Sequence, residues 1–324
     1  MNLAVSTPSW QLTDLRPTPD DILGDALTGL AATPKRLPSK YFYDAAGSRL
    51  FEAITRQPEY YPTRVELALL AARGADIARA LGPRLHVVEY GSGSGRKTEL
   101  LLHALDAPLA YTAVEISRAT VLATTARLAD AFPHIAMLPV CADFTRPVPL
   151  PPPPERARGR LLFFPGSTLG NFDDDEAAAL LAAMAATVGA GGRLLIGLDL
   201  AKDAAVIEAA YNDAAGVTAA FTLNLLARLN REVGSDFDLA AFRHRAIYAH
   251  ARQRIETDLV SLRAQRVQVA GRRFDFAEGE AMRVEISAKY TDAGFAALVA
   301  RAGLRVIDGW NDPRDWVGLR LLQA

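Results

Sequence analysis

Apolar runs of strand length alternate with amphipathic segments through the middle of the chain. The runs cover residues 85–90, 111–115, 136–142, 160–165 and 192–198. Segments with apolar residues at helical spacing follow most of these runs. Strands that alternate with helices predict a parallel sheet covered by helices on both faces. Ligands in such α/β folds bind beyond the carboxyl ends of the strands.

The start of the chain lacks this alternation. Residues 1–60 predict helices and loops, among them an amphipathic helix over residues 47–55. Thr63 is expected to cap a helix over residues 64–80, because a threonine hydroxyl can accept a hydrogen bond from a free N–H group of the first turn.

The alternation also pauses after about residue 200. Residues 204–245 are predicted to be helical and residues 253–279 to form antiparallel strands and turns. A final helix over residues 292–302 and two hairpin-like strands then close the chain. We therefore expect two parts. A sheet domain comprises residues 61–199 and 287–324. An α+β substrate-binding lobe comprises residues 200–286, to which the N-terminal segment 1–60 contributes.

The sequence VVEYGSGSGRKTEL, residues 87–100, is the clearest candidate for a ligand site. Gly91, Gly93 and Gly95 can adopt positive φ and have no Cβ atom to block a ligand. The helix expected to begin near Arg96 adds free N–H groups. The pattern indicates either a dinucleotide site or the S-adenosylmethionine site of a class I methyltransferase.

Three acidic positions favour the second of these cofactors. Glu115 lies 24 residues after Gly91, a spacing suited to an acid that binds a ribose diol. Glu89 would attract the ammonium group of S-adenosylmethionine but repel a pyrophosphate. Asp143 and Phe144 end the next strand, where an acid and an apolar ring can bind adenine. In addition, the glycines do not fit the dinucleotide pattern G-x-G-x-x-G.

Composition narrows the function further. Lys and Arg number 36 against 37 Asp and Glu, so the net charge of −1 argues against a dedicated nucleic-acid binder. The single cysteine, Cys141, cannot form an internal disulfide, and the five histidines lack the spacing of metal ligands. We expect no bound metal, no signal peptide and no membrane span, and therefore a cytoplasmic protein that acts as a monomer on a small molecule.

Four further motifs are too specific for a general scaffold: KYFYDAAGSRL (40–50), QPEYYPT (57–63), PGSTLGNF (165–172) and the segment 274–291, which ends in VEISAKYT. With the glycine motif, they resemble the histidine-specific N-α-methyltransferase family from about Pro34 to the C-terminus. The resemblance implies trimethylation of the α-amine of L-histidine by S-adenosyl-L-methionine. The products would be hercynine, in the first step of ergothioneine biosynthesis, and S-adenosyl-L-homocysteine.

The resemblance also implies roles for individual residues. The α-amine would lie near Tyr43, which is a candidate to assist its deprotonation. The candidate substrate contacts are Tyr60, Gly166, Asn171, Tyr211, Glu285, Ile286 and Ser287. The candidate cofactor contacts are Glu89, Gly91, Gly93, Lys97, Glu115, Asp143 and Phe144.

Elementary chemistry supports the ring-binding pair in particular. Glu285 and Ser287 are two residues apart, so on a strand both would point to one face. A carboxylate can accept from one imidazole N–H, and a hydroxyl can donate to or accept from the other nitrogen. Local structure offers other roles, since the pair could lie on an exposed strand face and Asn171 could cap the next helix.

Two positions depart from the family pattern. Glu115 replaces the usual aspartate, although its longer side chain still reaches a diol. Thr257, in RIETDL, stands where the family often has a methionine near the substrate ring. Another aromatic amino acid therefore remains open as the substrate. A nucleic-acid or protein methyltransferase and a non-catalytic cofactor-binding subunit also remain open. Against them stand the lack of an Asn-Pro-Pro-aromatic motif and the full set of cofactor motifs.

Overall fold

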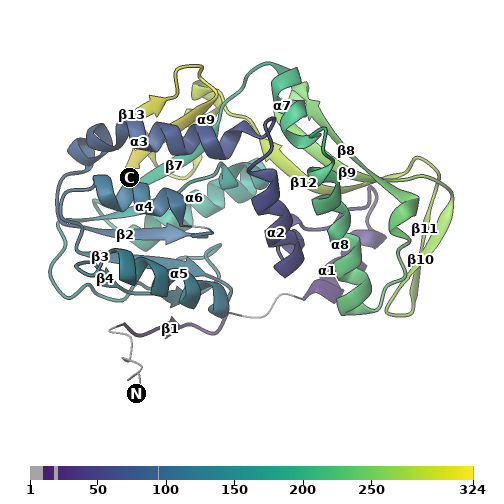
Figure 1. The fold of residues 1–324 in the computed structure, drawn as a ribbon, viewed down its shortest axis with the longest axis horizontal. Coiled ribbons are helices and arrows are strands. Elements are labelled where there is room, and N and C mark those ends of the chain that lie inside the picture. The colour runs from purple at the N-terminus through teal and green to yellow at the C-terminus, as the bar shows by residue number, and fades with distance from the viewer. Residues whose placement is uncertain (1–9, 18–20, 94, 324) are drawn as a thin grey trace, which may run out of the picture.

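The computed structural model describes residues 10–17, 21–93 and 95–323, so part of the expected N-terminal segment lies outside the described residues (Figure 1). A nine-stranded sheet forms its centre, in the order β1-β5-β3-β2-β6-β7-β14-β13 with β4 beside β3. The strands from β1 to β7 pair in parallel, whereas β14 is antiparallel to β7. The sheet strands are β1 (Thr13–Asp14), β2 (Leu85–Tyr90), β3 (Ala110–Glu115), β4 (Ala136–Met137), β5 (Val140–Cys141), β6 (Gly159–Phe164), β7 (Arg193–Asp199), β13 (Arg305–Asn311) and β14 (Val317–Gln323).

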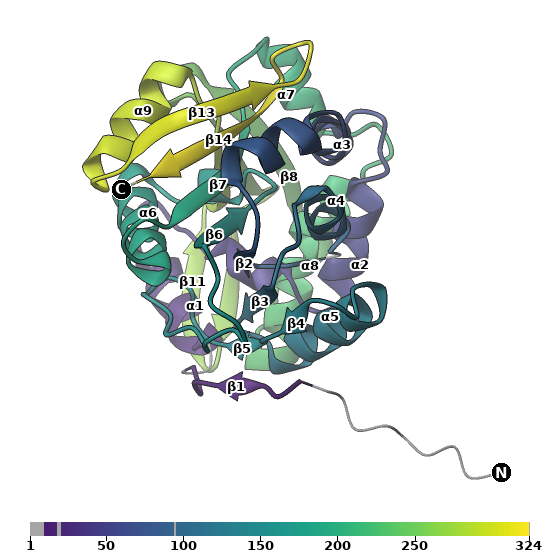
Figure 2. The same cartoon turned by 90° about the vertical axis from the view of Figure 1, so that its left-hand side faces the viewer.

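Helices cover both faces of this sheet (Figure 2). One face carries α3 (Tyr61–Leu81), α4 (Arg96–Ala104) and α5 (Arg118–Ala131), and the other carries α6 (Asp174–Val188) and α9 (Asp292–Arg301). Each face buries its own hydrophobic cluster, as expected when strands are apolar on both sides. The predicted class I methyltransferase sheet, with its antiparallel strand near the C-terminus, is confirmed.

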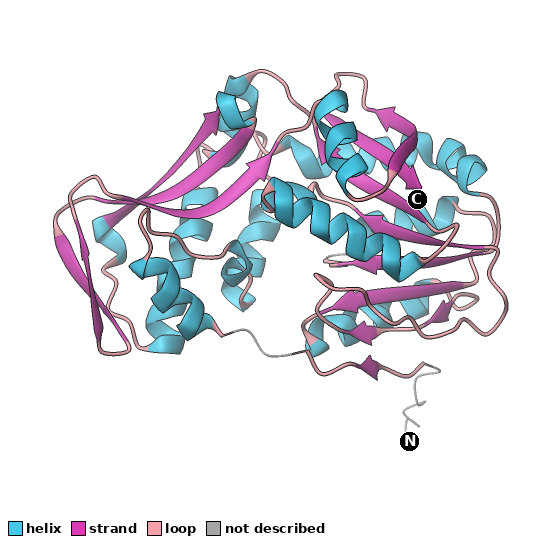
Figure 3. Ribbon diagram, turned by 180° about the vertical axis from the view of Figure 1, so that it is seen from behind, coloured by secondary structure: helices cyan, strands magenta, loops and turns pink. Residues whose placement is uncertain are grey.

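A second sheet stands apart from the first (Figure 3). It has three antiparallel strands in the order β12-β9-β8, and a separate hairpin, β10-β11, lies beyond it. Its elements are β8 (Phe242–Ala249), β9 (Arg254–Ser261), β10 (Gln265–Val269), β11 (Arg272–Phe276) and β12 (Ala281–Ala288). The helices that accompany it are α1 (Ile22–Ala31), α2 (Ala45–Ile54), α7 (Ala204–Tyr211) and α8 (Val217–Val233).

Segments far apart in sequence share one core here. Leu30 and Phe42, from the N-terminal segment, join the same buried cluster as Phe221, Leu225 and Val284. The rings of Phe42 and Phe221 lie 4.8 Å apart between centroids. The N-terminal helices are therefore built into the smaller sheet's layer rather than appended to the outside of the protein.

Several expected boundaries are wrong. The strand predicted over residues 136–142 is divided into β4 and β5 around Pro139, which has no N–H to donate to a sheet. Residues 204–245 are not continuously helical, because α8 ends at Val233, before Gly234 with a φ of 66°, and β8 begins at Phe242. Strand β12 runs to Ala288, so the division of the chain expected between residues 286 and 287 falls within this strand and stays a prediction.

The helix expected over residues 64–80 starts earlier, at Tyr61. Pro62 occupies its first turn, where the missing N–H has no cost, and the cap position is Tyr60 rather than Thr63. The tyrosines of the PEYYP motif are thus fixed at the start of a long helix. Within the described part of the chain, no helix combines the length and apolarity required to cross a bilayer.

Candidate active site

A cavity of about 2040 Å³ lies between the carboxyl ends of the sheet strands and the smaller sheet. Its walls contain nearly every residue that the sequence nominated. These are Tyr43, Tyr60, Glu89, Gly91, Gly93, Lys97, Glu115, Phe144, Gly166, Asn171, Tyr211, Glu285, Ile286 and Ser287. The cavity therefore joins the glycine motif to the β12 motif in one continuous space.

The loop after β2 presents open backbone to this cavity. Gly91 and Gly93 have φ values of 70° and 50°, and a Cβ atom on either would meet no atom within 4 Å. Glu115, at the end of β3, accepts a hydrogen bond from the Ser92 hydroxyl at 3.3 Å. Burial raises the pKa of Glu115, while the N–H groups of Ser92 and Gly93 act in the opposite direction. The loop therefore leaves its backbone open to a ligand, and the carboxylate beside it offers acceptors for a diol.

Glu89 is buried at the base of the same loop. Its carboxylate accepts hydrogen bonds of 2.6 Å from the hydroxyls of both Thr98 and Tyr111. Burial raises the pKa of Glu89 to about 8, against the effect of these two hydrogen bonds. A cationic group bound here would favour the ionised carboxylate, so the residue suits an ammonium better than an anion.

This raised pKa predicts a pH effect on stability. A carboxyl group with a raised pKa stabilises the fold fully below pH 4.5, and that contribution is lost as the pH rises through about 8. We therefore compare the melting temperature of Glu89→Gln with that of the unmodified protein. We expect the difference to favour the variant more at pH 9 than at pH 5.5. A change of one pKa unit corresponds to about 1.4 kcal/mol. Thermal melts of the ligand-free proteins measure this. Glu99→Gln, which changes a partly exposed acid of α4, is the control. A difference in melting temperature that does not vary with pH would contradict the assignment.

Lys97 has a partner that the sequence did not reveal. Its ammonium lies 2.5 Å from a carboxylate oxygen of Glu66 on α3, and the Glu66 side chain is 3% exposed. Both Glu66 oxygens also accept from the backbone N–H of Gly166, each at 2.9 Å. Glu66 therefore ties the glycine motif to the loop after β6. No local pattern marks it, since it reads as an ordinary charge on a helix.

Asp143 lies apart from the other nominated cofactor contacts, and its contact with adenine stays a prediction. It is exposed, is absent from the cavity wall, and accepts hydrogen bonds from the N–H and the hydroxyl of Thr145. The carboxylate therefore stabilises a turn after β5 in this structure. Its neighbour Phe144 does line the cavity and stacks on Tyr90, with 5.3 Å between ring centroids.

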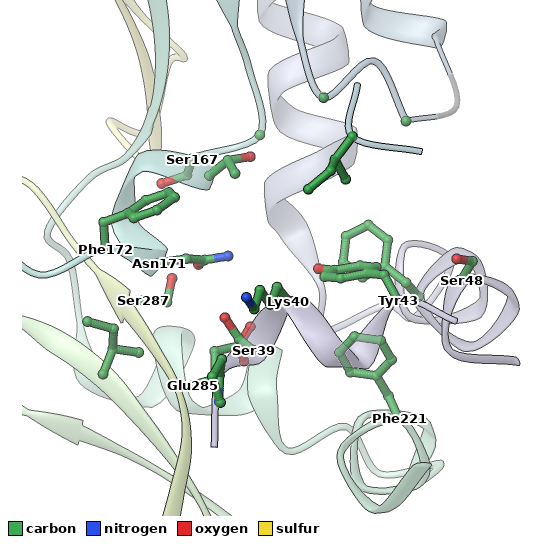
Figure 4. Close-up of a pocket in the computed structure, with 18 of the residues that line it drawn as sticks. Ser39, Lys40, Tyr43, Ser48, Ser167, Asn171, Phe172, Phe221, Glu285 and Ser287 are labelled. Carbon is green, nitrogen blue, oxygen red and sulfur yellow. The ribbon is translucent and has the colours of Figure 1, made fainter. Parts of the chain in front are cut away.

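The other end of the cavity brings three motif residues together (Figure 4). Asn171, Glu285 and Ser287 point into the same space from the loop after β6 and from β12. Burial raises the pKa of Glu285 to about 7, while the positive charge of Lys289 and the neighbouring hydroxyl of Thr257 lower it. Asn171 does not cap α6; Asp173 does, with a capping box completed by Glu176.

Gly170 explains why the loop and the strand approach so closely. A Cβ atom at this position would lie 2.9 Å from the carbonyl oxygen and 3.0 Å from the nitrogen of Ala288 on β12. Only glycine allows Asn171 to sit against the strand that carries Glu285 and Ser287.

Gly170→Ala should therefore push the loop away from β12. We expect a loss of about 1–3 kcal/mol in the free energy of unfolding, because backbone atoms on both sides have little room to move. Chemical denaturation measures the loss. Gly159→Ala is the matched control, since its new Cβ would meet only the Leu85 side chain, at 3.4 Å. Equal stability of the two variants would show that the contact is not tight.

Aromatic rings form the side wall near Glu285. Tyr43 packs edge-on against Phe51 and Phe221, with centroids 5.7 and 5.6 Å away. Tyr60 packs against Phe51 and Tyr211 in the same manner. Tyr43 is 45% exposed where it lines the cavity, but the protein packed around it raises its pKa, and the negative charge of Glu285 raises it further. At neutral pH Tyr43 is therefore a protonated phenol in an aromatic wall.

The chain resembles known proteins along almost its whole length. A family model described as histidine-specific methyltransferase, SAM-dependent, matches residues 22–324. This chain belongs to that family. The sulfonium cofactor that the glycine motif favoured is thus the cofactor of the family, and the resemblance inferred from FYD, PEYYPT and GSTLGN is confirmed.

Individual members of the family agree with this placement. The histidine N-alpha-methyltransferase of Mycolicibacterium smegmatis is 43% identical over 302 residues, covering 92% of this chain and 93% of the relative. The protein of that name from Mycobacterium tuberculosis is 41% identical over the same shares of the two chains. Ergothioneine biosynthesis protein 1 of Neurospora crassa is 28% identical over 307 residues, 89% of this chain and 33% of the relative.

One position of this methyltransferase that departs from the family pattern lies close to Glu285. Thr257 is directly opposite Glu285 in the β9–β12 ladder and is 1% exposed. It is absent from the cavity wall. Its side chain therefore influences Glu285 from behind rather than by touching a ligand.

The methyltransferase also contains a buried ionic cluster that the sequence analysis missed. Asp199, at the end of β7, lies 2.9 Å from the ammonium of Lys289 and 2.5 Å from that of Lys202. It also accepts from the Tyr61 hydroxyl at 2.8 Å. Burial opposes the charge of Asp199, but the two lysines outweigh it and hold the pKa below its usual range. The sequence did offer one sign of Lys289. It stands two residues after Ser287, as Ser287 stands two after Glu285, so an extended chain would point all three side chains to one side.

Proposed function

We propose that this protein methylates the α-amine of L-histidine three times, with S-adenosyl-L-methionine as donor, and so produces hercynine for ergothioneine biosynthesis. The observation that carries the proposal is the meeting of Asn171, Glu285 and Ser287 in one cavity with the glycine motif. A neighbouring hydroxyl and carboxylate complement the two ring nitrogens of histidine. An apolar side chain would leave these buried polar groups unpaired.

The chain offers a distinct place for each part of the reaction. The loop of Gly91 and Gly93, with Glu115, would hold the adenosine, and Glu89 would face the ammonium of the donor. The bound donor supplies a sulfonium methyl group and leaves as S-adenosyl-L-homocysteine. Asn171 and Tyr211 would hold the carboxylate of the amino acid. The protein thereby contributes mainly position and alignment.

The amine must be deprotonated before each transfer. Tyr43 is a poor candidate for the base itself, because a phenol is protonated at neutral pH and the negative charge of Glu285 acts to raise its pKa further. We infer that its hydroxyl orients the amine as a hydrogen-bond partner, while the proton leaves to water. The second lobe, built from the N-terminal helices and residues 200–286, would supply this wall and the ring-binding pair.

A direct assay tests the proposal. The purified protein is incubated with methyl-labelled S-adenosylmethionine and each of the twenty amino acids in turn, and products are identified by mass spectrometry. We expect label only with histidine, at masses for one, two and three added methyl groups. Transfer to another amino acid with none to histidine would refute the substrate assignment.

One observation favours a second candidate, another aromatic amino acid. Thr257 lies behind Glu285 and differs from the methionine often found there, so the setting of the ring-binding carboxylate is altered. The same panel of amino acids distinguishes the two substrates.

A further inference from the structure

Lys289 is a buried cation one step outside the cavity wall. Its side chain is 0% exposed, and it follows Ser287 by two residues, directly after the end of β12. Nothing in the proposed reaction requires a charge at this place. A buried ammonium is costly unless each of its protons is bound, so its contacts carry information.

The three protons of this ammonium have three acceptors. Lys289 Nζ lies 2.9 Å from Asp199 Oδ2, 2.9 Å from the Tyr211 hydroxyl and 2.8 Å from Ser287 Oγ. An ammonium donates and cannot accept. Each of the two hydroxyl oxygens must therefore accept a hydrogen bond from Lys289 and use one of its lone pairs to do so.

The two hydroxyls are also bonded to each other. The Tyr211 hydroxyl donates to Ser287 Oγ at 2.8 Å. The serine oxygen then accepts twice, from Tyr211 and from Lys289, and its remaining capacity is its own proton. A phenol is a stronger donor than an aliphatic hydroxyl, so this direction is favoured and the free proton stays on Ser287, which lines the cavity.

We propose that Lys289 is a positioning residue that makes Ser287 a hydrogen-bond donor toward the cavity. Beside Ser287, the carboxylate of Glu285 is an acceptor. Together they select a ring with one bare nitrogen and one N–H, the neutral form of imidazole, and reject a ring without a bare nitrogen. This inference rests on the proposed function and adds the reason for its selectivity.

Lys202 provides a matched control for Lys289. Its ammonium also binds Asp199, and it donates to the Tyr61 hydroxyl at 2.9 Å, but it has no hydrogen bond to Tyr211 or Ser287 among the contacts of the described residues. Lys289→Met and Lys202→Met each remove one buried ammonium from the same carboxylate. Only Lys289→Met also removes the N–H group that donates to Ser287 and leaves the serine proton free for the cavity.

The readout is a ratio of kcat/KM values for L-histidine and for 3-(pyrrol-2-yl)-L-alanine, whose ring has an N–H and no bare nitrogen. We expect Lys289→Met to lower this ratio at least tenfold, with the Kd for S-adenosyl-L-homocysteine changed by less than about twofold. Lys202→Met should leave the ratio within about twofold. A folded Lys289→Met protein with an unchanged ratio would overturn the inference.

A second measurement uses the unmodified protein and does not depend on the folding of a variant. Histidine labelled with ¹⁵N in the ring is bound to the complex with S-adenosyl-L-homocysteine at pH 7. We expect one pyridine-type and one pyrrole-type nitrogen resonance; two pyrrole-type resonances would overturn the inference. Absence of any histidine methylation by the unmodified protein would instead defeat the proposed function, so the two failures are distinguishable.

Discussion

Replacing Glu285 with alanine should lower kcat/KM for histidine by about 10²- to 10³-fold. The carboxylate points into the cavity beside Ser287, and its loss would leave a ring N–H without its protein acceptor. The affinity for S-adenosyl-L-homocysteine should change by less than about threefold, because the glycine motif lies on the main sheet. Steady-state kinetics and titration calorimetry measure the two effects.

Glu278→Ala is the control for this experiment. Glu278 is exposed in the turn between β11 and β12 and does not line the cavity. It should behave as the unmodified protein does. If Glu285→Ala weakened cofactor binding and histidine turnover equally, the carboxylate would not be the ring contact.

Asp199→Asn should have the largest effect on stability. Asp199 is 1% exposed and is paired with two buried lysines, so the change leaves two ammonium groups with no opposing charge. Removing one partner of a buried ion pair costs about 3–5 kcal/mol. For a protein of this size the melting temperature should fall by roughly 10 °C. Calorimetry measures the change.

Two further variants sharpen that test. Asp130→Asn changes an exposed aspartate of α5 and should melt with the unmodified protein. Adding Lys202→Met to Asp199→Asn should recover part of the lost stability, since one uncompensated charge is removed and the sites are in contact. If Asp199→Asn melted at a temperature close to that of the control, the ion pairs of Asp199 with Lys202 and Lys289 would not stabilise the fold.

The sequence predicted most of the main sheet because its strands are continuous apolar runs. Prediction failed where a single residue overrode the pattern, as Pro139 did between β4 and β5. It also failed in β8, FRHRAIYA, where three consecutive basic or polar residues interrupt any alternation, so the helical prediction for α8 extended through this strand. Short-range propensity could not show that this segment pairs with β9.

The site was predictable where it consists of motifs and unpredictable where it consists of long-range pairs. Glu285, Ser287 and Asn171 stand in recognisable motifs and line the cavity. The bond between Tyr61 and Asp199 joins residues 138 positions apart, and nothing local to either residue marks it. Asp143 follows β5 as expected, but its carboxylate closes a turn with Thr145 outside the cavity wall, so its contact with adenine stays a prediction.

The two ends of the cavity belong to different layers of the protein. The glycine motif follows a strand of the main sheet, whereas Glu285 sits on β12 with Thr257 behind it on β9. Changes in this facing pair can retune which side chain is accepted while the methyl-donor end keeps its geometry. Evolution can therefore diversify the amine that such an enzyme accepts by altering one small sheet, and inherit the transfer chemistry unchanged.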